Sequence, residues 1–188
     1  MKKAIVIIDM LNDFVTGGLK CERAQRIIPN IKKLIDAAHA ADIPVVFSND
    51  AHRPEGDREF EIWGPHAIAG TPGAQVIPEL KPTPKDYEVP KRRYSGFEGT
   101  DLNLYLMENK VEEVVLCGLH TNICVRHTSA DAFYNGYTIS VPEDCVDAFV
   151  EKDHKEGLEY LKMVYGARIT STNDIVKELK VPQGAQVN

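Results

Sequence analysis

The segment Lys3–Asp9 reads KAIVIID, an uninterrupted aliphatic run that ends in a carboxylate. Such a run is typical of a strand that is buried on both faces of a parallel sheet. The next strong signal, Ala24–Ala41, repeats apolar residues at the spacing of one helix face. It is followed by Ile43–Ser48, IPVVFS, which has the composition of a second strand. A strand, a helix and a strand in this order predict a parallel pair joined by a crossover helix.

The same alternation continues along the rest of the chain. Further strands are expected at Tyr87–Lys91, Glu112–Gly118, Tyr137–Val141 and Ala167–Thr170. Further helices are expected at Thr100–Asn109, Asn122–Asn135, Asp153–Tyr165 and Asn173–Leu179. We therefore predict a three-layer α/β fold, a doubly wound sheet of about six mostly parallel strands with helices on both faces. The 188 residues suit a single domain, 1–188, whose tail 181–188 we expect to be frayed.

Composition narrows the classes of function. The net charge of −6 argues against nucleic acid or an anionic membrane as the main partner. The apolar run Ala4–Ile8 is too short for a membrane span or a signal peptide, so we expect a cytoplasmic protein. The four cysteines include no C-x-x-C pair, so neither a zinc ribbon nor a redox pair is indicated. Neither G-x-G-x-x-G nor G-x-x-x-x-G-K-[ST] occurs, so no nucleotide-phosphate fingerprint is present. We also expect a homo-oligomer.

Ionisable side chains stand at the carboxyl ends of the predicted strands, the edge at which parallel α/β sheets bind ligands. Four strands contribute: Asp9 closes the first, Asp50 and His52 follow the second, Lys91 closes the third and Cys124 follows the fourth. A helix N-terminus and Lys91 would favour a thiolate at Cys124, and Asp9 could accept its proton. Each residue also has a structural alternative. Cys124 could be a small residue packed under the helix, Lys91 the start of a solvated basic run, and Asp9 a turn cap.

A second cluster belongs to the long loop after the second strand. The D-x-H pair Asp50 and His52 places a carboxylate and an imidazole on the same side of an extended segment, and Glu59 and His66 follow. Imidazole and carboxylate together suit zinc, iron or manganese. Spacing alone leaves open that these are solvated loop residues.

Three segments of the chain resemble those of a known family. Asp9 in IIDMLNDF, Lys91 in KRRYSGFEGTDL and Cys124 in GLHTNICVRHTSADAFYNGY resemble the triad of the isochorismatase-like cysteine hydrolases, in the same order and spacing. Within that superfamily the chain is most similar to nicotinamidases. The resemblance implies that Asp9, Lys91 and Cys124 are catalytic and that a thioester acyl-enzyme forms. It also implies that the backbone N–H groups of His120 and Cys124 hold the oxyanion.

The similarity to nicotinamidases implies further site residues. It implies one divalent metal ion, zinc or alternatively iron or manganese, bound by residues already noted: Asp50, His52, His66 and Glu59. It also implies that Phe14 and Trp63 hold a substrate ring between them, and it places a cis peptide bond at Leu119–His120.

The implied activity is hydrolysis of nicotinamide to nicotinate and ammonia, a step of NAD salvage in pyridine nucleotide metabolism. Two positions depart from the family pattern: Asn122 stands where many nicotinamidases have an acid, and His120 where a small residue is frequent. The alternatives are a related cysteine hydrolase of another small amide, ureido or carbamoyl compound, a vinyl-ether hydrolase, and an inactive scaffold. Cys21, Cys117 and Cys145 are assigned structural roles, with Cys145 the nearest of them to the site edge.

Overall fold

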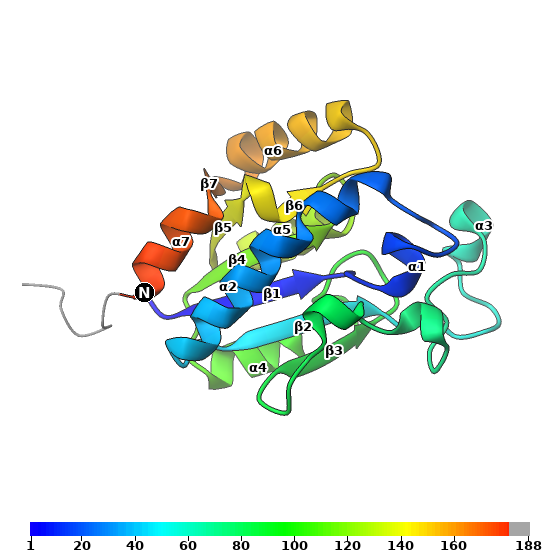
Figure 1. Ribbon diagram of the computed structural model, residues 1–188, viewed down its shortest axis with the longest axis horizontal. Helices are drawn as coiled ribbons and strands as arrows, with labels where there is room; N and C mark the ends of the chain where they lie inside the picture. Colours follow the sequence, from blue (N-terminus) through cyan, green and yellow to red (C-terminus); the bar gives the residue numbers. More distant parts are fainter. Residues whose placement is uncertain (181–188) are drawn as a thin grey trace, which may run out of the picture.

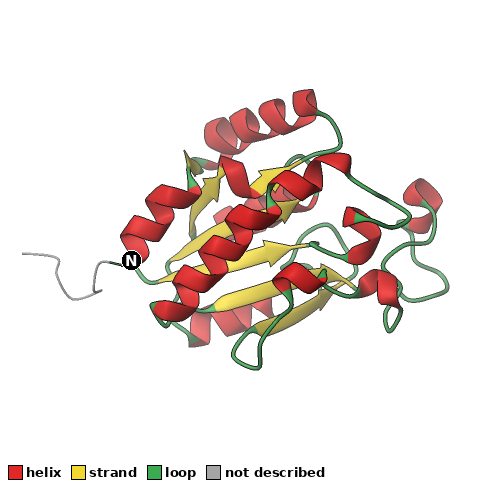
Figure 2. Cartoon of the chain, in the orientation of Figure 1, coloured by secondary structure: helices red, strands yellow, loops and turns green. Residues whose placement is uncertain are grey.

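The computed structural model describes residues 1–180, and the tail that we expect to be frayed lies outside the described residues. Within residues 1–180 the chain forms one seven-stranded sheet covered by helices (Figures 1 and 2). The strands are β1 (Lys3–Ile8), β2 (Val45–Asp50), β3 (Tyr87–Lys91), β4 (Glu113–Leu119), β5 (Thr138–Pro142), β6 (Val146–Asp147) and β7 (Arg168–Thr170). The α-helices are α1 (Asn12–Val15), α2 (Ile28–Ala40), α3 (Phe60–Trp63), α4 (Leu102–Glu108), α5 (Cys124–Tyr134), α6 (Glu151–Tyr165) and α7 (Thr172–Leu179). Short 3-10 helices lie at Glu22–Arg26, Pro72–Ala74, Pro78–Leu80 and Glu143–Cys145.

The order of the strands determines where a site can form. The sheet has the order β3-β2-β1-β4-β5-β7, with β6 paired to β4. The chain therefore winds outward from β1 to β3, returns to the centre at β4 and winds outward on the other side. The strand pairs are parallel, so the carboxyl ends of the strands meet at one edge. Open α/β sheets bind ligands where the winding reverses, which here is between β1 and β4.

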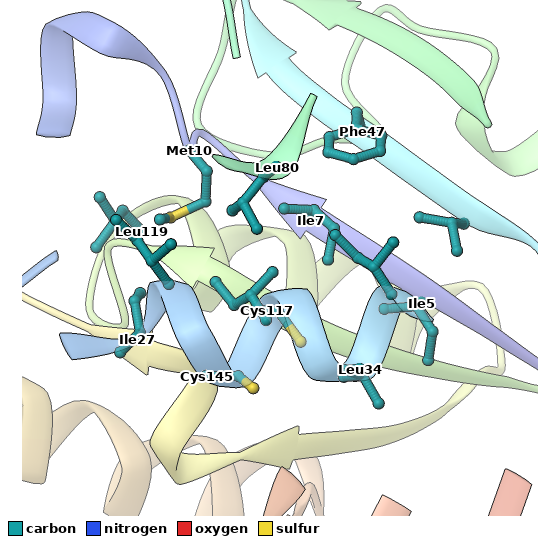
Figure 3. Packing of buried hydrophobic residues seen from close by; sticks show 14 of the residues in the cluster. Ile5, Ile7, Met10, Ile27, Leu34, Phe47, Leu80, Cys117, Leu119 and Cys145 are labelled. Atoms are coloured by element: carbon teal, nitrogen blue, oxygen red, sulfur yellow. The ribbon is translucent and has the colours of Figure 1, made fainter. Parts of the chain in front are cut away.

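The two faces of β1 belong to different cores. Ile5 and Ile7 pack with apolar residues of α2 and α7, and Figure 3 shows both side chains in the cluster that also contains Leu34 of α2. Val6 and Ile8 pack instead with residues of α4, α5 and α6. This burial on both faces explains why the β1 sequence is apolar at successive positions rather than alternating. The predicted three-layer fold with helices on both faces is confirmed.

The element boundaries differ from the expected ones at positions that matter for the site. The helix expected at Ala24–Ala41 is divided into a 3-10 turn and α2, with Pro29 in the first turn of α2, where its missing N–H is tolerated. β2 extends to Asp50, which therefore ends a strand instead of starting a loop. The two-residue β6 was not predicted. None of the helices formed by residues 1–180 is both long and apolar enough to cross a lipid bilayer.

β1 and β4 approach each other closely where the winding reverses. Gly118 has a φ angle of 103°, and a Cβ atom at this position would lie only 2.0 Å from the carbonyl oxygen of Ile8. Only glycine fits both requirements. The next peptide bond but one, Leu119–His120, is cis, as the resemblance implied. β4 thus leads directly from the end of β1 into the turn that precedes α5.

Candidate active site

The three residues of the predicted triad meet at the carboxyl edge of the sheet. Asp9 follows β1, Lys91 ends β3 and Cys124 begins α5. The Nζ atom of Lys91 lies 2.8 Å from Oδ2 of Asp9 and 3.8 Å from Sγ of Cys124. Asp9 and Lys91 are each 1% exposed and Cys124 is 5% exposed. The alternative that Lys91 begins a solvated basic run is therefore wrong.

Asp9 is held by two neighbours. Its Oδ1 accepts a hydrogen bond of 2.8 Å from the backbone N–H of Asp50, and its Oδ2 faces the ammonium group of Lys91. Burial and the nearby charge of Asp50 raise the pKa of Asp9 to about 6, although Lys91 acts in the opposite direction. A carboxyl group with a pKa this close to neutrality is well suited to accept and return a proton.

Burial has the largest effect on the ionisation of the Cys124 thiol. Burial raises the pKa of the thiol well above its usual range; Lys91 opposes this effect, and the charges of Asp9 and Asp50 add to it. Lys91 acts in favour of the thiolate, as expected from the sequence, but the desolvation of the buried sulfur is the larger effect. Nucleophilic attack therefore requires a base. The carboxylate oxygen of Asp9 and the sulfur of Cys124 lie within 4.8 Å of each other.

Two backbone N–H groups beside the thiol are free to bind an anion. Within residues 1–180, neither the N–H of Cys124, the first residue of α5, nor that of His120 donates a hydrogen bond. The carbonyl group of His120 accepts bonds from Ile123 and Val125 at 2.9 and 3.2 Å, which closes the turn around the sulfur. Free N–H groups next to a nucleophile are what an oxyanion hole requires.

The four predicted metal ligands converge beside this triad. One ligand atom from each buried residue lies within 4.8 Å of the others, in the set Asp50, His52, Glu59 and His66. The loop after β2 doubles back to bring them together: His52 forms a bridge with Ile68, and its N–H donates to the Ala67 carbonyl at 2.9 Å. The alternative that these are solvated loop residues is therefore wrong.

Neighbouring groups determine which atoms face the centre of this cluster. Nδ1 of His66 lies 2.7 Å from the carbonyl oxygen of Gly64 and donates to it, so Nε2 is available as a ligand. Nδ1 of His52 lies 3.0 Å from the Asp57 carboxylate, which likewise leaves Nε2 available. Nε2 of His52 and Oε1 of Glu59 are buried without a hydrogen-bond partner. Converging, unsatisfied donor atoms of this kind fit a divalent metal ion.

A pocket with aromatic walls opens onto the sulfur. It is lined by Phe14, Leu19, Asp50, Glu59, Trp63, His66, Tyr94, His120, Ile123, Cys124 and Phe149. Both predicted substrate-binding residues, Phe14 and Trp63, are among them. Phe14 packs against His66 and His120, with ring centroids 5.7 and 6.0 Å away. Trp63 instead stacks with Phe149, at a centroid distance of 6.1 Å and an interplanar angle of 28°.

Sequence reasoning missed two residues of the site, Phe149 and Asp57, and wrongly placed Cys145 near its edge. Phe149 follows the unpredicted β6. Asp57 is buried beside His52, and the basic run Arg92–Arg93, which donates to it at 3.0 and 3.2 Å, was the available signal. Cys145 is not near the site edge: it lies in the core on the α2 side, with Sγ 3.0 Å from Oγ1 of Thr172.

A doubly wound α/β sheet with Asp, Lys and Cys at its reversal point, beside four potential metal ligands, defines the class of protein. Residues 3–174 match the family model described as the isochorismatase domain, and the chain belongs to the isochorismatase family. N-carbamoylsarcosine amidase from Thermoplasma acidophilum is 42% identical, with a TM-score of 0.87 over 92% of this chain and 98% of that chain. Nicotinamidase/pyrazinamidase PncA from Bacillus subtilis is 36% identical, with a TM-score of 0.87 over 91% and 100% of the two chains. The pyrazinamidase of Pyrococcus horikoshii, solved in complex with zinc, is 30% identical, with a TM-score of 0.84 over 91% and 99%.

These comparisons confirm the predicted family and reaction class. The similar proteins are named as amidases, so a hydrolase acting on the carbon–nitrogen bond of an amide is confirmed at the level of the family. They are named for different amides, and a shared fold does not identify a substrate.

Proposed function

We propose that the protein is a metal-containing cysteine amidohydrolase that converts nicotinamide and water to nicotinate and ammonia, in cytoplasmic NAD salvage. One observation carries the proposal: a buried cysteine, aromatic walls and three of the four clustered metal-ligand residues, Asp50, Glu59 and His66, line one pocket. The similarity to a nicotinamidase and to a zinc-containing pyrazinamidase supports the same assignment.

The proposed reaction proceeds by covalent catalysis. Asp9 accepts the proton of Cys124, and the sulfur forms a bond to the amide carbon. The N–H groups of His120 and Cys124 stabilise the oxyanion, which is typically worth about 3 kcal/mol for each donor. Asp9 returns the proton to the departing nitrogen as the carbon–nitrogen bond breaks and ammonia leaves. Asp9 then takes a proton from water, which attacks the thioester, and the thiol is restored as nicotinate is released.

The metal ligands are proposed to be Asp50, His52, Glu59 and His66, and a divalent ion bound there would supply a coordination position for the ring nitrogen of the substrate. Asp50 links this cluster to the triad. Its Oδ1 pairs with the ammonium group of Lys91, and its Oδ2 lies 3.5 Å from Nε2 of His52. The set of imidazoles and carboxylates favours zinc, with iron or manganese as alternatives.

The charges around the pocket favour a neutral substrate. Among the described residues that line it there is no arginine or lysine, and the nearby Lys91 is already paired with Asp9 and Asp50. The negative charge of a substrate carboxylate would therefore have to be neutralised by the metal ion, and the carboxylate would lie close to the acidic side chains of Asp50 and Glu59. Nicotinamide is neutral and planar, which suits aromatic walls. The second candidate, hydrolysis of another small amide or carbamoyl compound, is favoured by the 42% identity to N-carbamoylsarcosine amidase.

A panel of amides, scored by ammonia release with zinc present, tests the proposal. Nicotinamide and pyrazinamide should be hydrolysed, and benzamide, which lacks the ring nitrogen, much more slowly. Equal rates on benzamide and nicotinamide would refute ring binding through the metal. Turnover of N-carbamoylsarcosine without turnover of nicotinamide would establish the second candidate instead. The Cys124→Ala variant serves as the control for contaminating activity.

A further inference from the structure

We propose that Asp147 and His154 are positioning residues for the reaction: together they hold in place the turn that presents the backbone N–H of His120 to the oxyanion. The inference rests on the proposed function only in requiring that an oxyanion forms beside Cys124. It gives a role to β6 and α6, which contribute none of the predicted site residues.

β6 holds the chain on both sides of His120. Before His120, the last two residues of β4 pair in parallel with the two residues of β6. After it, the N–H of Thr121 donates a hydrogen bond of 2.8 Å to the carbonyl oxygen of Asp147. The N–H of His120 lies between these two attachments and donates no hydrogen bond within residues 1–180. Because the chain is fixed on either side, this N–H keeps its direction without a partner of its own.

Asp147 is in turn anchored by three donors. Nε of Arg23 and Nε of Arg26, both from the 3-10 helix Glu22–Arg26, donate to its two carboxylate oxygens at 2.7 and 2.9 Å. The N–H of Ala148 donates to Oδ1 at 2.9 Å. Asp147 is only 2% exposed, so these donors replace the water that the carboxylate loses on burial. The residue whose carbonyl group holds Thr121 is therefore itself fixed through its side chain.

α6 fixes the side chain of Thr121. Nδ1 of His154 lies 2.9 Å from Oγ1 of Thr121, a hydrogen-bond distance. Thr121 is fully buried, and a Cβ atom at Gly157, one turn further along α6, would lie only 3.0 Å from its Cγ2. Glycine is a poor helix former, and this close approach of the turn accounts for its presence inside α6. The turn is thus in direct contact with the helix, and a movement of Thr121 would break its hydrogen bond to His154.

The chemistry explains why such support matters. Donors stabilise an oxyanion best when they are oriented before the charge develops. A displacement of about 1 Å at a reacting centre can lower the rate about 100-fold. Neither Asp147 nor His154 lines the pocket that opens onto Cys124. Changes at these two residues should therefore lower kcat and leave KM nearly unchanged.

A double-mutant cycle between Thr121→Val and His154→Leu tests the positioning role in the zinc-loaded enzyme. Each single variant should lower kcat for the amide that is turned over about tenfold, with KM within about twofold, and the double variant should lose little more. His154→Asn, whose side-chain amide can take the place of Nδ1, should recover most of kcat. His39→Leu is the matched control and should change neither constant, because this partly buried histidine pairs with Asp86 at the end of α2.

Protection of Cys124 from iodoacetamide gives a second measurement, which needs no amide turnover. The thiol adds to pyridine-3-carbaldehyde: a sulfur–carbon bond forms, the thiol proton passes to Asp9, and the electron pair of the C=O bond moves to the oxygen, which faces the oxyanion donors. Alkylation by iodoacetamide develops no such charge. His154→Leu and Asp147→Ala should each raise the aldehyde concentration needed for protection about tenfold, with alkylation in its absence within about twofold.

Wild-type kcat and wild-type protection in His154→Leu and Asp147→Ala would overturn the inference. So would independent effects of Thr121→Val and His154→Leu, or no recovery in His154→Asn. Alkylation slowed as much as turnover would also overturn it, because the whole site would then be disturbed. Weakened protection in these variants, together with a wild-type enzyme that releases no ammonia from nicotinamide, would support the positioning role while refuting the proposed substrate.

Discussion

Replacing Lys91 with methionine would remove the cation between two buried carboxylates. The ammonium group lies 2.8 Å from Asp9 and also pairs with Asp50, and each of the three residues is 2% exposed or less. Breaking a buried ion pair by removing one partner typically costs about 3–5 kcal/mol, because the remaining charge stays desolvated. Methionine nearly preserves the volume, so little of the effect comes from a cavity. We therefore expect Lys91→Met to lower the free energy of unfolding by about 3–5 kcal/mol.

Urea denaturation of chelator-treated protein, followed by circular dichroism, measures this loss without a metal ion to replace the charge. Lys85→Met, at an exposed position, is the control and should change stability by less than about 0.5 kcal/mol. Adding Asp9→Asn to Lys91→Met should recover about 1 kcal/mol or more, because one of the two uncompensated charges is removed. A loss below about 1 kcal/mol in Lys91→Met would refute the view that this cation holds the two carboxylates together.

Three further predictions concern the metal ligands, the reversal point and the thiol. Asp57→Ala should weaken zinc binding about 10- to 100-fold in competition with a chelator, because His52 loses the group beside its Nδ1; unchanged affinity would contradict that role. Gly118→Ala should destabilise the protein by about 3 kcal/mol in urea, since its Cβ would clash with the Ile8 carbonyl; a wild-type midpoint would show that the junction relaxes. Iodoacetamide should modify Cys124 before the other thiols, because the pocket opens onto this sulfur and Asp9 can accept its proton, as peptide mapping would show; faster modification elsewhere would count against it as the reactive thiol.

The sequence alone was sufficient to predict that residues far apart in the chain lie in one site. Asp9, Lys91 and Cys124 lie far apart in the chain, but each follows or ends a predicted parallel strand, and the carboxyl ends of such strands share an edge. The observed register, with Asp50 opposite Lys91, is a consequence of the same pattern. The D-x-H spacing likewise placed Asp50 and His52 together, because alternate residues of an extended segment face the same side.

Other features depend on packing that no spacing rule describes. β6 has only two residues and therefore no periodicity, so the position of Phe149 after it could not be anticipated. The choice of Phe149 as the stacking partner of Trp63 depends on the path of the loop that carries α3. The raised pKa of Cys124 follows from burial, which outweighs the nearby cation. The homo-oligomer and the exclusion of nucleic acid stay predictions.

The central claim is that Cys124 forms a thioester with a small amide, and mass spectrometry of enzyme quenched in acid during turnover of nicotinamide tests it most directly. The proposed mechanism predicts an adduct of one nicotinoyl group on the peptide that contains Cys124, removable by hydroxylamine. It also predicts that Cys124→Ala loses both this adduct and ammonia release. Ammonia release at the wild-type rate in Cys124→Ala, with no adduct in the wild-type enzyme, would contradict the claim.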